Sequence, residues 1–514
     1  MPTLTIHADS AVKHWSFSSK QSLAAVLQQA GIGLQMPCGG NHTCGKCKVR
    51  CCSGALSPLT TEEAALLSPE EQAGGVRLAC LTRVVGDASV LLHEKTTVST
   101  LSAVTLPEHT LGRQGLGLAV DIGTTTVAMQ LYQLETGALL AEALGINRQD
   151  RFGADVISRI ESSNQQGVAS LQACIHCQLE EMAASCMRQA GTDHLDAAVI
   201  TGNTTMLHFW EGLDPRGIAV APFTPASLFG CTGRTAIAGI APYLPPCLGP
   251  YVGADIVCAV LSSSGLMGRV DETAVLADLG TNGEIVLFHQ GRLYCASTAM
   301  GPAFEGAGLS CGMQASPGAI STVSPGQDGS LTISVIGGAE AQGICGSGAL
   351  DAVAVLLECG ALDESGLLEK SSPLVCERNG QSAVQFPGTS VYLTQKDIRQ
   401  IQLAKAALCA GIQTLLETAS LKLEQVHRLY IAGGFGHYMN LDSAARIGLF
   451  PPCLRSKARV LGNAALAGAV TLLLDPSYMD ILSDITSRAE EIPLSGNSTF
   501  SDNYIDHITF ESEE

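Results

Sequence analysis

Two patterns of hydrophobic and polar positions divide the chain. Near the N-terminus, Leu4 and Ile6 alternate with polar neighbours, which predicts a half-buried strand, and residues 22–30 favour a short helix. After a cysteine-rich loop, residues 48–52 and 77–83 are expected to form two more strands. These short elements predict a small mixed α/β module.

Beyond residue 115 the pattern changes to buried apolar strands that alternate with helices, which is typical of an α/β domain. Between the two patterns, residues 96–115 hold Ser, Thr, Pro and Gly without clear periodicity and are expected to form a linker. Fully extended, such a linker would reach about 65–70 Å. We therefore expect a module over residues 1–95, this linker, and a domain over residues 116–514.

The second domain repeats itself. The same order of features occurs twice, an apolar strand, Asp-x-Gly-Thr, a second apolar strand and a glycine turn, in LAVDIGTTTVAMQLYQLETG from Leu118 and in VLADLGTNGEIVLFHQGRL from Val275. Each half then closes with a strand that runs into a glycine-containing loop, in AAVITGNTTM and in LYIAGGFG. Two copies of one α/β unit, over about 116–250 and 251–514, are expected to face each other across a central cleft, a natural ligand site.

The amino-acid composition narrows the classes of protein to which the chain can belong. The chain has 514 residues, of which 46% are apolar and only 15% are charged, so a folded protein of two or more domains is expected. The net charge of −19 argues against a nucleic-acid surface, which needs clustered Lys and Arg. No apolar run is long enough to span a bilayer, and the first residues alternate instead of forming a signal core, so a cytosolic protein without a membrane partner is predicted. In the cytosol the 19 cysteines stay reduced unless they bind metal.

The cysteine-rich loop has the spacing of an iron–sulfur ligand set. Cys38, Cys44 and Cys47 follow the pattern Cys-x5-Cys-x2-Cys, and Cys80 stands alone further on. A [2Fe–2S] cluster needs four thiolates, and the glycines in CGGNHTCGKC let the backbone curl around it. Zinc sites usually show two paired cysteine knuckles, so a zinc site and a set of buried free cysteines are the weaker alternatives. The predicted metal ligands are Cys38, Cys44, Cys47 and Cys80.

Other patterns are interpreted structurally. The run GGNHTCGK resembles a phosphate-binding loop, but a cysteine follows it where Ser or Thr is required. Cys51 and Cys52, which follow the loop, are expected to pack within a strand. Cys174 and Cys177 lie in an amphipathic helical stretch, where we expect core cysteines on one face.

Two Asp-x-Gly-Thr turns carry the candidate nucleotide chemistry. Each ends a buried strand in a candidate catalytic carboxylate, Asp121 or Asp278, and continues into a turn whose N–H groups and hydroxyls can donate to phosphate oxygens. The carboxylates are expected to face a divalent cation, Mg²⁺, through water. One such turn is common, but two in matching contexts predict a clamp on one polyphosphate. The turn residues expected to bind the nucleotide are Gly123, Thr124, Thr125, Thr126, Gly280, Thr281, Asn282 and Gly283.

Three further segments are candidates for the same cleft. Gly433 and Gly434 follow an apolar strand and suit close packing against adenine or ribose. Gly346 and Ser347, in GICGSG, open a helix whose N–H groups either hold phosphate or only complete a tight turn. Glu305, in GPAFEGAG, is either a polar cleft residue or a structural one.

In combination these motifs resemble the reductive activators of corrinoid proteins, which are ATP-dependent iron–sulfur proteins. The matching segments are CGGNHTCGKC, DIGTTT, TGNTTM, DLGTNGE, GPAFEGAG, ICGSGALD, TQKDIRQIQLAKAA, IAGGFG and GNAALAGA. The resemblance covers nearly the whole chain. It implies a ferredoxin-type β-grasp [2Fe–2S] module followed by a duplicated RNase-H-like ATPase fold of the actin/sugar-kinase/heat-shock-chaperone type. It also implies that the four cysteines bind the cluster and that both Asp-x-Gly-Thr turns, with Gly433 and Gly434, bind ATP.

The resemblance further implies a function and partners. Members of the family pass an electron to an inactive Co(II) corrinoid protein, which restores Co(I) for methyl transfer, and they receive that electron from an upstream donor. Direct transfer from a ferredoxin-type cluster is uphill, so ATP is expected to supply the difference. Larger members carry a middle domain linked to dimerisation. Only the linker is expected between the two modules here, which counts against a homodimer.

Other classes of function remain open. A small-molecule kinase of the sugar-kinase class, with a regulatory redox domain, would use Asp278 beside an acceptor hydroxyl, although the sequence shows no sugar-binding signature. An activator of radical dehydratases would carry a bridging [4Fe–4S] cluster, which does not fit the separate four-cysteine module. A plain electron carrier leaves the paired phosphate turns unexplained.

Overall fold

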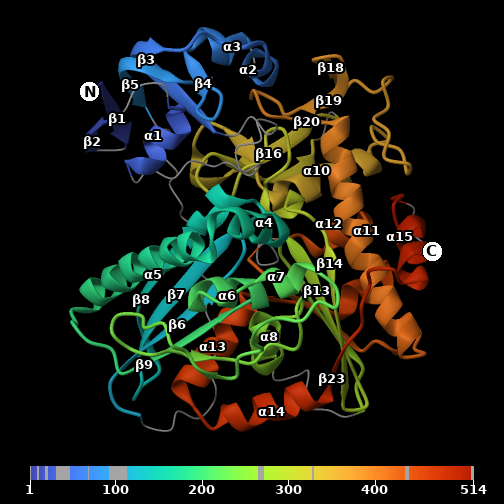
Figure 1. Cartoon of the computed structure of the whole chain (residues 1–514). Coiled ribbons are helices and arrows are strands. Elements are labelled where there is room, and N and C mark those ends of the chain that lie inside the picture. Colours follow the sequence, from blue (N-terminus) through green and yellow to red (C-terminus); the bar gives the residue numbers. More distant parts are fainter. Residues whose placement is uncertain are drawn as a thin grey trace. The chain divides into compact units, whose positions relative to one another are not determined.

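The computed structural model divides the chain into two compact units (Figure 1). One holds residues 1–96 together with 146–178, and the other holds residues 97–145 and 179–514. The structure describes residues 2–8, 11–17, 21–30, 47–67, 69–91, 113–263, 271–326, 329–434 and 439–510. Among the described residues, no helix is both long and apolar enough to cross a membrane.

A five-stranded sheet forms the framework of the first unit, with strand order β2-β1-β5-β3-β4. β1 pairs with β2 antiparallel and with β5 parallel, while β3 pairs antiparallel with both β4 and β5. Leu4 and Ile6 are fully buried, as their alternation predicts. The elements are β1 (Thr3–Ala8), β2 (Ala11–Ser16), α1 (Leu23–Gln29), β3 (Lys48–Leu56), α2 (Thr61–Leu66), α3 (Pro69–Ala73), β4 (Val76–Leu78) and β5 (Val84–Leu91).

The strand expected over residues 77–83 is wrong in part. β4 ends at Leu78, because the next residues fold back on it. The N–H groups of Leu81 and Thr82 both donate to the carbonyl of Leu78, at 3.0 and 2.9 Å. This turn separates β4 from β5 and carries Cys80.

The first unit also contains residues 146–178, a segment that the sequence places in the second domain. It consists of η1 (Arg148–Phe152), α4 (Val156–Gln166) and the first part of α5 (Val168–Ala190). The Gln178 amide ties the ends of this segment together, since it accepts from the N–H of Arg148 at 2.9 Å and donates to the carbonyl of Ile146 at 2.7 Å. On α5, Cys174 is buried but Cys177 is exposed, so the prediction of core cysteines is wrong for Cys177.

Two six-stranded sheets of the same design form the framework of the second unit, which also holds two three-stranded sheets, β16-β15-β17 and β18-β19-β20. The first six-stranded sheet has the order β10-β11-β9-β6-β7-β8 and the second β22-β21-β12-β13-β14-β23. The first uses β6 (Leu116–Ile122), β7 (Thr126–Gln133), β8 (Ala138–Ile146), β9 (Ala197–Gly202), β10 (Cys231–Thr232) and β11 (Tyr243–Leu244). The second uses β12 (Ala274–Leu279), β13 (Asn282–His289), β14 (Arg292–Ala299), β21 (Arg428–Ala432), β22 (Ala458–Gly462) and β23 (Ala489–Glu491). The strands of the three-stranded sheets are β15 (Ala319–Pro325), β16 (Leu331–Val335), β17 (Gly343–Ile344), β18 (Val375–Arg378), β19 (Gln381–Gln385) and β20 (Tyr392–Thr394).

The two sheets place their carboxylates at equivalent positions. Asp121 sits near the end of β6, which pairs antiparallel with β7 and parallel with β9. Asp278 sits near the end of β12, which pairs antiparallel with β13 and parallel with β21. The repetition seen in the sequence is therefore a repetition of strand order and direction.

Two buried helices, α8 (Ala254–Ser262) and α13 (Ala464–Leu474), pack against each other in the core that both sheets share (Figure 1). They approach so closely that a Cβ added at Gly468 would lie 2.1 Å from the carbonyl oxygen of Cys258. Residues in the first turns of the two helices, Asp255 and Ala465, line the same cavity as Asp121 and Asp278.

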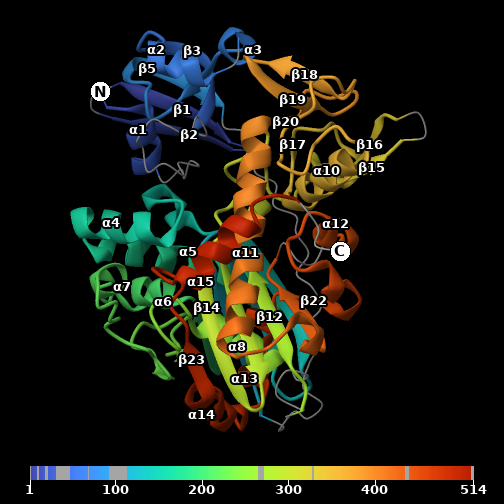
Figure 2. The same cartoon turned by 90° about the vertical axis from the view of Figure 1, so that its right-hand side faces the viewer.

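Helix α11 (Gln395–Thr418) packs against β13 and β14 of the second sheet. Figure 2 shows α11 and α15 (Ser498–Asp506) side by side, and the Asn503 amide donates to the hydroxyl of Thr414 at 3.3 Å. The shorter helix α10 (Gly346–Glu358) and the 3-10 turn η2 (Ala303–Glu305) belong to the same buried core. This core holds the loops that line the cavity described below.

Candidate cluster ligands and nucleotide cavity

Two of the four predicted cluster ligands meet in the first unit. The sulfur atoms of Cys47 and Cys80 are 3.2 Å apart, and the N–H of Cys80 points at the sulfur of Cys47 at 3.5 Å. Thiolates that share one tetrahedral metal at about 2.3 Å lie roughly 3.7 Å apart, so this pair fits two ligands of one iron. Cys38 and Cys44 lie outside the described residues.

A buried carboxylate holds the turn that presents Cys80. Glu63, on α2, is fully buried and accepts hydrogen bonds from the Arg77 guanidinium, the N–H of Leu78 and the hydroxyl of Thr82. Burial alone would raise the pKa of Glu63, but the hydrogen bonds from Arg77, Leu78 and Thr82 outweigh it and lower the pKa below its usual value. Glu63 was not among the residues predicted from the sequence, although it lies in the first turn of a short helix whose N-cap is Thr60.

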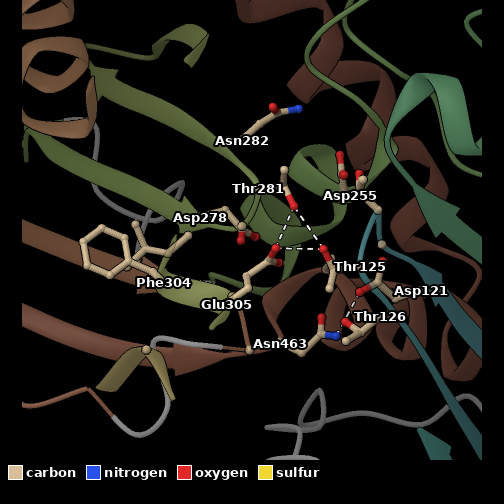
Figure 3. Close-up of a pocket in the computed structure, with 18 of the residues that line it drawn as sticks. Asp121, Thr125, Thr126, Asp255, Asp278, Thr281, Asn282, Phe304, Glu305 and Asn463 are labelled. Carbon is tan, nitrogen blue, oxygen red and sulfur yellow. Dashed lines mark hydrogen bonds between the residues drawn. The ribbon is translucent and has the colours of Figure 1, made fainter. Parts of the chain in front are cut away.

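In the second unit, both Asp-x-Gly-Thr turns open into one cavity of about 240 Å³ (Figure 3). Its lining comes from the ends of β6 and β12, the starts of β7 and β13, and the starts of α8, α10 and α13. The lining residues are Asp121, Gly123, Thr124, Thr125, Thr126, Leu144, Gly145, Asn203, Asp255, Asp278, Leu279, Gly280, Thr281, Asn282, Glu284, Phe304, Glu305, Gln314, Ala315, Cys345, Gly346, Ser347, Gly433, Gly434, Asn463 and Ala465.

The structure brings together all the residues predicted for this cleft except Gly283. Gly283 does not line the cavity, because β13 begins at Asn282 and Gly283 already lies within the strand. A Cβ at Gly283 would lie 2.4 Å from the sulfur of Met300, so the glycine serves close packing. Its assignment to ligand binding stays a prediction.

Glycine is required where the backbone passes the carboxylates. Gly433 has φ of 97°, and a Cβ there would lie 2.5 Å from the carbonyl oxygen of Leu279 and 2.9 Å from Oδ1 of Asp278. A Cβ at Gly123 would lie 2.7 Å from the carbonyl oxygen of Thr126. Any side chain at either position would displace a phosphate turn.

Five carboxylates line the cavity, three more than the two expected from the turns. The additional ones are Asp255 in the first turn of α8, Glu284 on β13 and Glu305 on η2 (Figure 3 labels Asp255 and Glu305). Burial is the main cause that raises the pKa of Asp121 to about 6, of Asp255 to about 7 and of Asp278 to about 8. Burial, with the charges of Asp255 and Asp278, also raises the pKa of Glu284 well above its usual value. The buried negative charge of these carboxylates favours the binding of a cation in the cavity.

No lysine or arginine is among the described residues of the cavity lining. A polyphosphate in this cavity would therefore need a metal ion to balance its charge. Within the described parts of the chain, no three His, Cys, Asp or Glu side chains are arranged to ligate a metal directly.

Two asparagines that the sequence analysis missed connect helix starts to the first phosphate turn. Asn463 caps α13 and donates through Nδ2 to Oδ2 of Asp121 at 2.9 Å (Figure 3). Asn203 caps α6 (Thr204–Glu211) and donates through Nδ2 to the hydroxyl of Thr124 at 3.0 Å. Both follow a strand and a glycine, in ITGN and LGN, and this N-cap pattern is the signal that could have identified them.

The serine of the GICGSG segment, Ser347, has a structural role. Ser347 donates its hydroxyl to the carbonyl of Ser321 at 2.9 Å, and a Cβ at Gly348 would lie 2.3 Å from the carbonyl oxygen of Ile320. The side chain is thus committed to the fold. The N-terminus of α10, beginning at Gly346, still faces the cavity.

Comparison with known proteins identifies the family. Three family models match in succession: a 2Fe-2S iron-sulfur cluster binding domain over residues 13–85, the RACo middle region over 116–267, and the C-terminal domain of RACo, the ASKHA domain, over 272–514. The chain is 34% identical over 435 residues to the corrinoid activation enzyme RamQ of Eubacterium limosum, with 79% of this chain and 72% of RamQ covered. The chain belongs to the family of reductive activators of corrinoid proteins.

Two further members of the family support this assignment. The [Co(II) methylated amine-specific corrinoid protein] reductase of Methanosarcina barkeri is 28% identical over 434 residues, which cover 77% of each chain. A solved structure of a reductive activator for corrinoid, iron-sulfur protein matches with a TM-score of 0.70 and 29% identity over 98% of both chains. The predicted fold class, a ferredoxin module followed by an ATPase fold of the actin/sugar-kinase type, is confirmed.

The expectation that only a linker separates the two modules needs correction. The family's middle region matches residues 116–267, directly after the linker, and this is the segment that forms the first six-stranded sheet. From the sequence alone this segment is not distinct, because it repeats the strand pattern of the C-terminal half. The argument against a homodimer therefore loses its basis.

Proposed function

We propose that this chain is an ATP-dependent reductive activator that transfers one electron from a [2Fe–2S] cluster to an inactive Co(II) corrinoid protein. The cluster is oxidised by one electron and cobalt is reduced to Co(I), which is then competent for methyl transfer. In this proposal Cys38, Cys44, Cys47 and Cys80 hold the cluster, and the cavity of the second unit holds Mg·ATP. An upstream donor reduces the cluster again, and the protein works in the cytosol.

The observation that carries the ATP requirement is the convergence of both Asp-x-Gly-Thr turns on one cavity. The hydroxyls of Thr125 and Thr281 lie 3.0 Å apart although their turns come from different sheets. Two donor-rich turns that converge in this way can donate together to one polyphosphate. Asp121 and Asp278, at equivalent strand ends, are the proposed partners of Mg²⁺ through water.

The role of ATP follows from the redox step. Ferredoxin-type clusters have potentials near −400 mV, and each 59 mV of uphill transfer costs about tenfold in the equilibrium constant. Nucleotide binding can shift that equilibrium only if it favours one arrangement of the protein over another. A cavity built from two separate sheets is suited to this, because closing on a phosphate moves one sheet relative to the other.

The test is ATP-dependent formation of Co(I). The reduced protein is mixed anaerobically with a Co(II) corrinoid protein under a weak reductant, and cobalt absorbance is followed with and without Mg·ATP. Co(I) is expected only with ATP, and ATP hydrolysis should rise when the corrinoid protein is present. The same mixture is screened for phosphorylated sugars, because a small-molecule kinase would form such a product without any cobalt change. Equal Co(I) yields without ATP would contradict the proposal.

A further inference from the structure

Glu305 bridges the two phosphate turns. Its Oε2 atom accepts a hydrogen bond from the hydroxyl of Thr125 at 2.7 Å and another from the hydroxyl of Thr281 at 2.6 Å (Figure 3). Each threonine has one hydroxyl proton. With both protons directed at Glu305, the 3.0 Å contact between the two hydroxyls is held by the shared acceptor. One carboxylate oxygen thus joins the two sheets through their turns.

The backbone fixes the position of this carboxylate. Ala303 and Phe304, which precede it on η2, are 4% and 3% exposed and belong to the core of the second sheet. Gly306, which follows, has φ of 75°, and a Cβ there would lie 1.9 Å from the carbonyl oxygen of Met313. The backbone at Glu305 is therefore confined, and only its side chain is placed to move.

A phosphate would compete with Glu305 for the same donors. The Thr125 and Thr281 hydroxyls are the groups expected to donate to a polyphosphate, and Glu305 already receives both. Its carboxylate also lies in a cavity with four others, where a further anion is unfavourable unless one of the anions moves or a cation intervenes. The carboxylate therefore occupies the place of a phosphate group.

We propose that Glu305 is a specificity-determining residue that the terminal phosphate of a nucleoside triphosphate must displace. A diphosphate, which lacks that group, leaves both Glu305 hydrogen bonds in place. The triphosphate takes over the two threonine hydroxyls, and the side chain of Glu305 rotates away. The protein thereby distinguishes ATP from ADP through the connection between its two sheets. The inference rests on the proposed function only in requiring that the cavity binds nucleotide.

The experiment compares affinities for Mg²⁺ with a non-hydrolysable ATP analogue and with ADP, measured by calorimetry on the full chain. Glu305→Ala removes a competitor worth about two hydrogen bonds, so the ratio of triphosphate to diphosphate affinity should rise roughly tenfold. Glu305→Gln keeps the shape but accepts more weakly, so it should shift the ratio in the same direction by less. A merely structural role would change both affinities equally and leave the ratio unaltered.

Glu211→Gln is the matched control. Glu211 also accepts two hydrogen bonds, from the N–H groups of Arg234 and Thr235 at 2.9 and 3.1 Å, but it does not line the cavity. This variant should keep the wild-type ratio. An unchanged or lowered ratio in both Glu305 variants would overturn the inference, and Glu305→Gln alone decides if Glu305→Ala does not fold. Failure of the wild-type protein to bind either nucleotide would instead count against the proposed function.

Discussion

Asn463 donates a hydrogen bond of 2.9 Å from Nδ2 to Oδ2 of Asp121, across 342 positions of sequence. The same side chain caps α13, since its Oδ1 accepts from the N–H of Leu466 at 2.8 Å. One residue therefore fixes the start of a helix in the second half and the orientation of a carboxylate in the first half. Among the groups acting on Asp121, this hydrogen bond opposes burial and lowers the pKa of the carboxyl.

We expect Asn463→Asp to separate these two roles. Aspartate is also a good N-cap, so α13 should keep its start, but its carboxylate would face that of Asp121. Affinity for Mg·ATP should fall about tenfold or change its dependence on Mg²⁺ concentration, as measured by calorimetry. Asn497→Ala, which removes the corresponding cap of α15, is the control and should leave nucleotide affinity unaltered. Wild-type affinity in Asn463→Asp would show that the hydrogen bond to Asp121 does not matter for the site.

The cysteine pair predicts which thiols the cluster needs. Cys80→Ser should lose most of its iron and sulfide, because the sulfur of Cys80 lies 3.2 Å from that of Cys47, close enough for both to bind one iron. Cys52→Ser should retain about two irons and two sulfides per chain, since Cys52 is exposed on β3. Iron and sulfide content after anaerobic purification gives the answer. Normal content in Cys80→Ser would exclude Cys80 as a ligand.

Glu63 should contribute more to the stability of the ferredoxin module than Glu71, a more exposed carboxylate. Glu63→Gln removes the charge that faces the Arg77 guanidinium in a buried site, and we expect a loss of about 2–4 kcal/mol in the stability of the ferredoxin module. Glu71→Gln weakens the partly exposed ion pair with Lys48 and should cost less than about 1 kcal/mol. Denaturation followed by the cluster absorbance compares the two. Equal effects would contradict a positioning role for Glu63.

Glu63 also makes the stability of the ferredoxin module depend on pH, in a known direction. The pKa of Glu63 is lower in the folded protein than its usual value of 4.5. The stability it contributes is therefore present above that value and is lost as the pH falls through the folded pKa. Cluster absorbance in the wild-type protein should become labile to acid below about pH 4.5, and this acid step should be absent from Glu63→Gln. An unchanged acid step in the variant would assign it to other groups.

The sequence predicted those parts of the site that lie next to one another in the chain. Asp121 and Asp278 could be found because each stands in a local strand–turn pattern that occurs twice. Asp255 and Asn463 could not, because only the packing of α8 against α13 brings their helix starts to the turns. Gly283 lies within β13 and not in the turn before it, since the boundary between a turn and a strand is set by pairing, here with Thr298 of β14. Position along a strand is therefore predictable, whereas contact between distant elements depends on the core.

The raised pKa values of the buried carboxylates in the cavity lead to a prediction for Asp278. Burial, with the charges of Asp255, Asp121 and Glu305, raises its pKa from 3.8 to about 8. The folded protein holds this proton more tightly than the unfolded chain does, so stability falls as the pH rises from about 4 to about 8. Asparagine imitates the protonated acid. Asp278→Asn should therefore raise the melting temperature of the metal-free protein by roughly 2 °C or more at pH 8.5, with a smaller gain at pH 5.5.

Mg·ATP should reverse this difference in thermal stability between Asp278→Asn and the wild-type protein. A cation in the cavity stabilises the ionised carboxylate, so the wild-type protein should gain more from Mg·ATP at pH 8.5 than Asp278→Asn does. The measurement is thermal unfolding of the transition that Mg·ATP shifts, at both pH values, with and without the nucleotide. In parallel, cluster absorbance should stay normal in Asp278→Asn, because the cysteines belong to the other unit, while ATP-dependent Co(I) formation should be lost. If Asp278→Asn destabilises the protein equally at both pH values, the ionised carboxylate of Asp278 is not an unfavourable buried charge. If the variant still forms Co(I) with ATP, Asp278 does not serve the nucleotide.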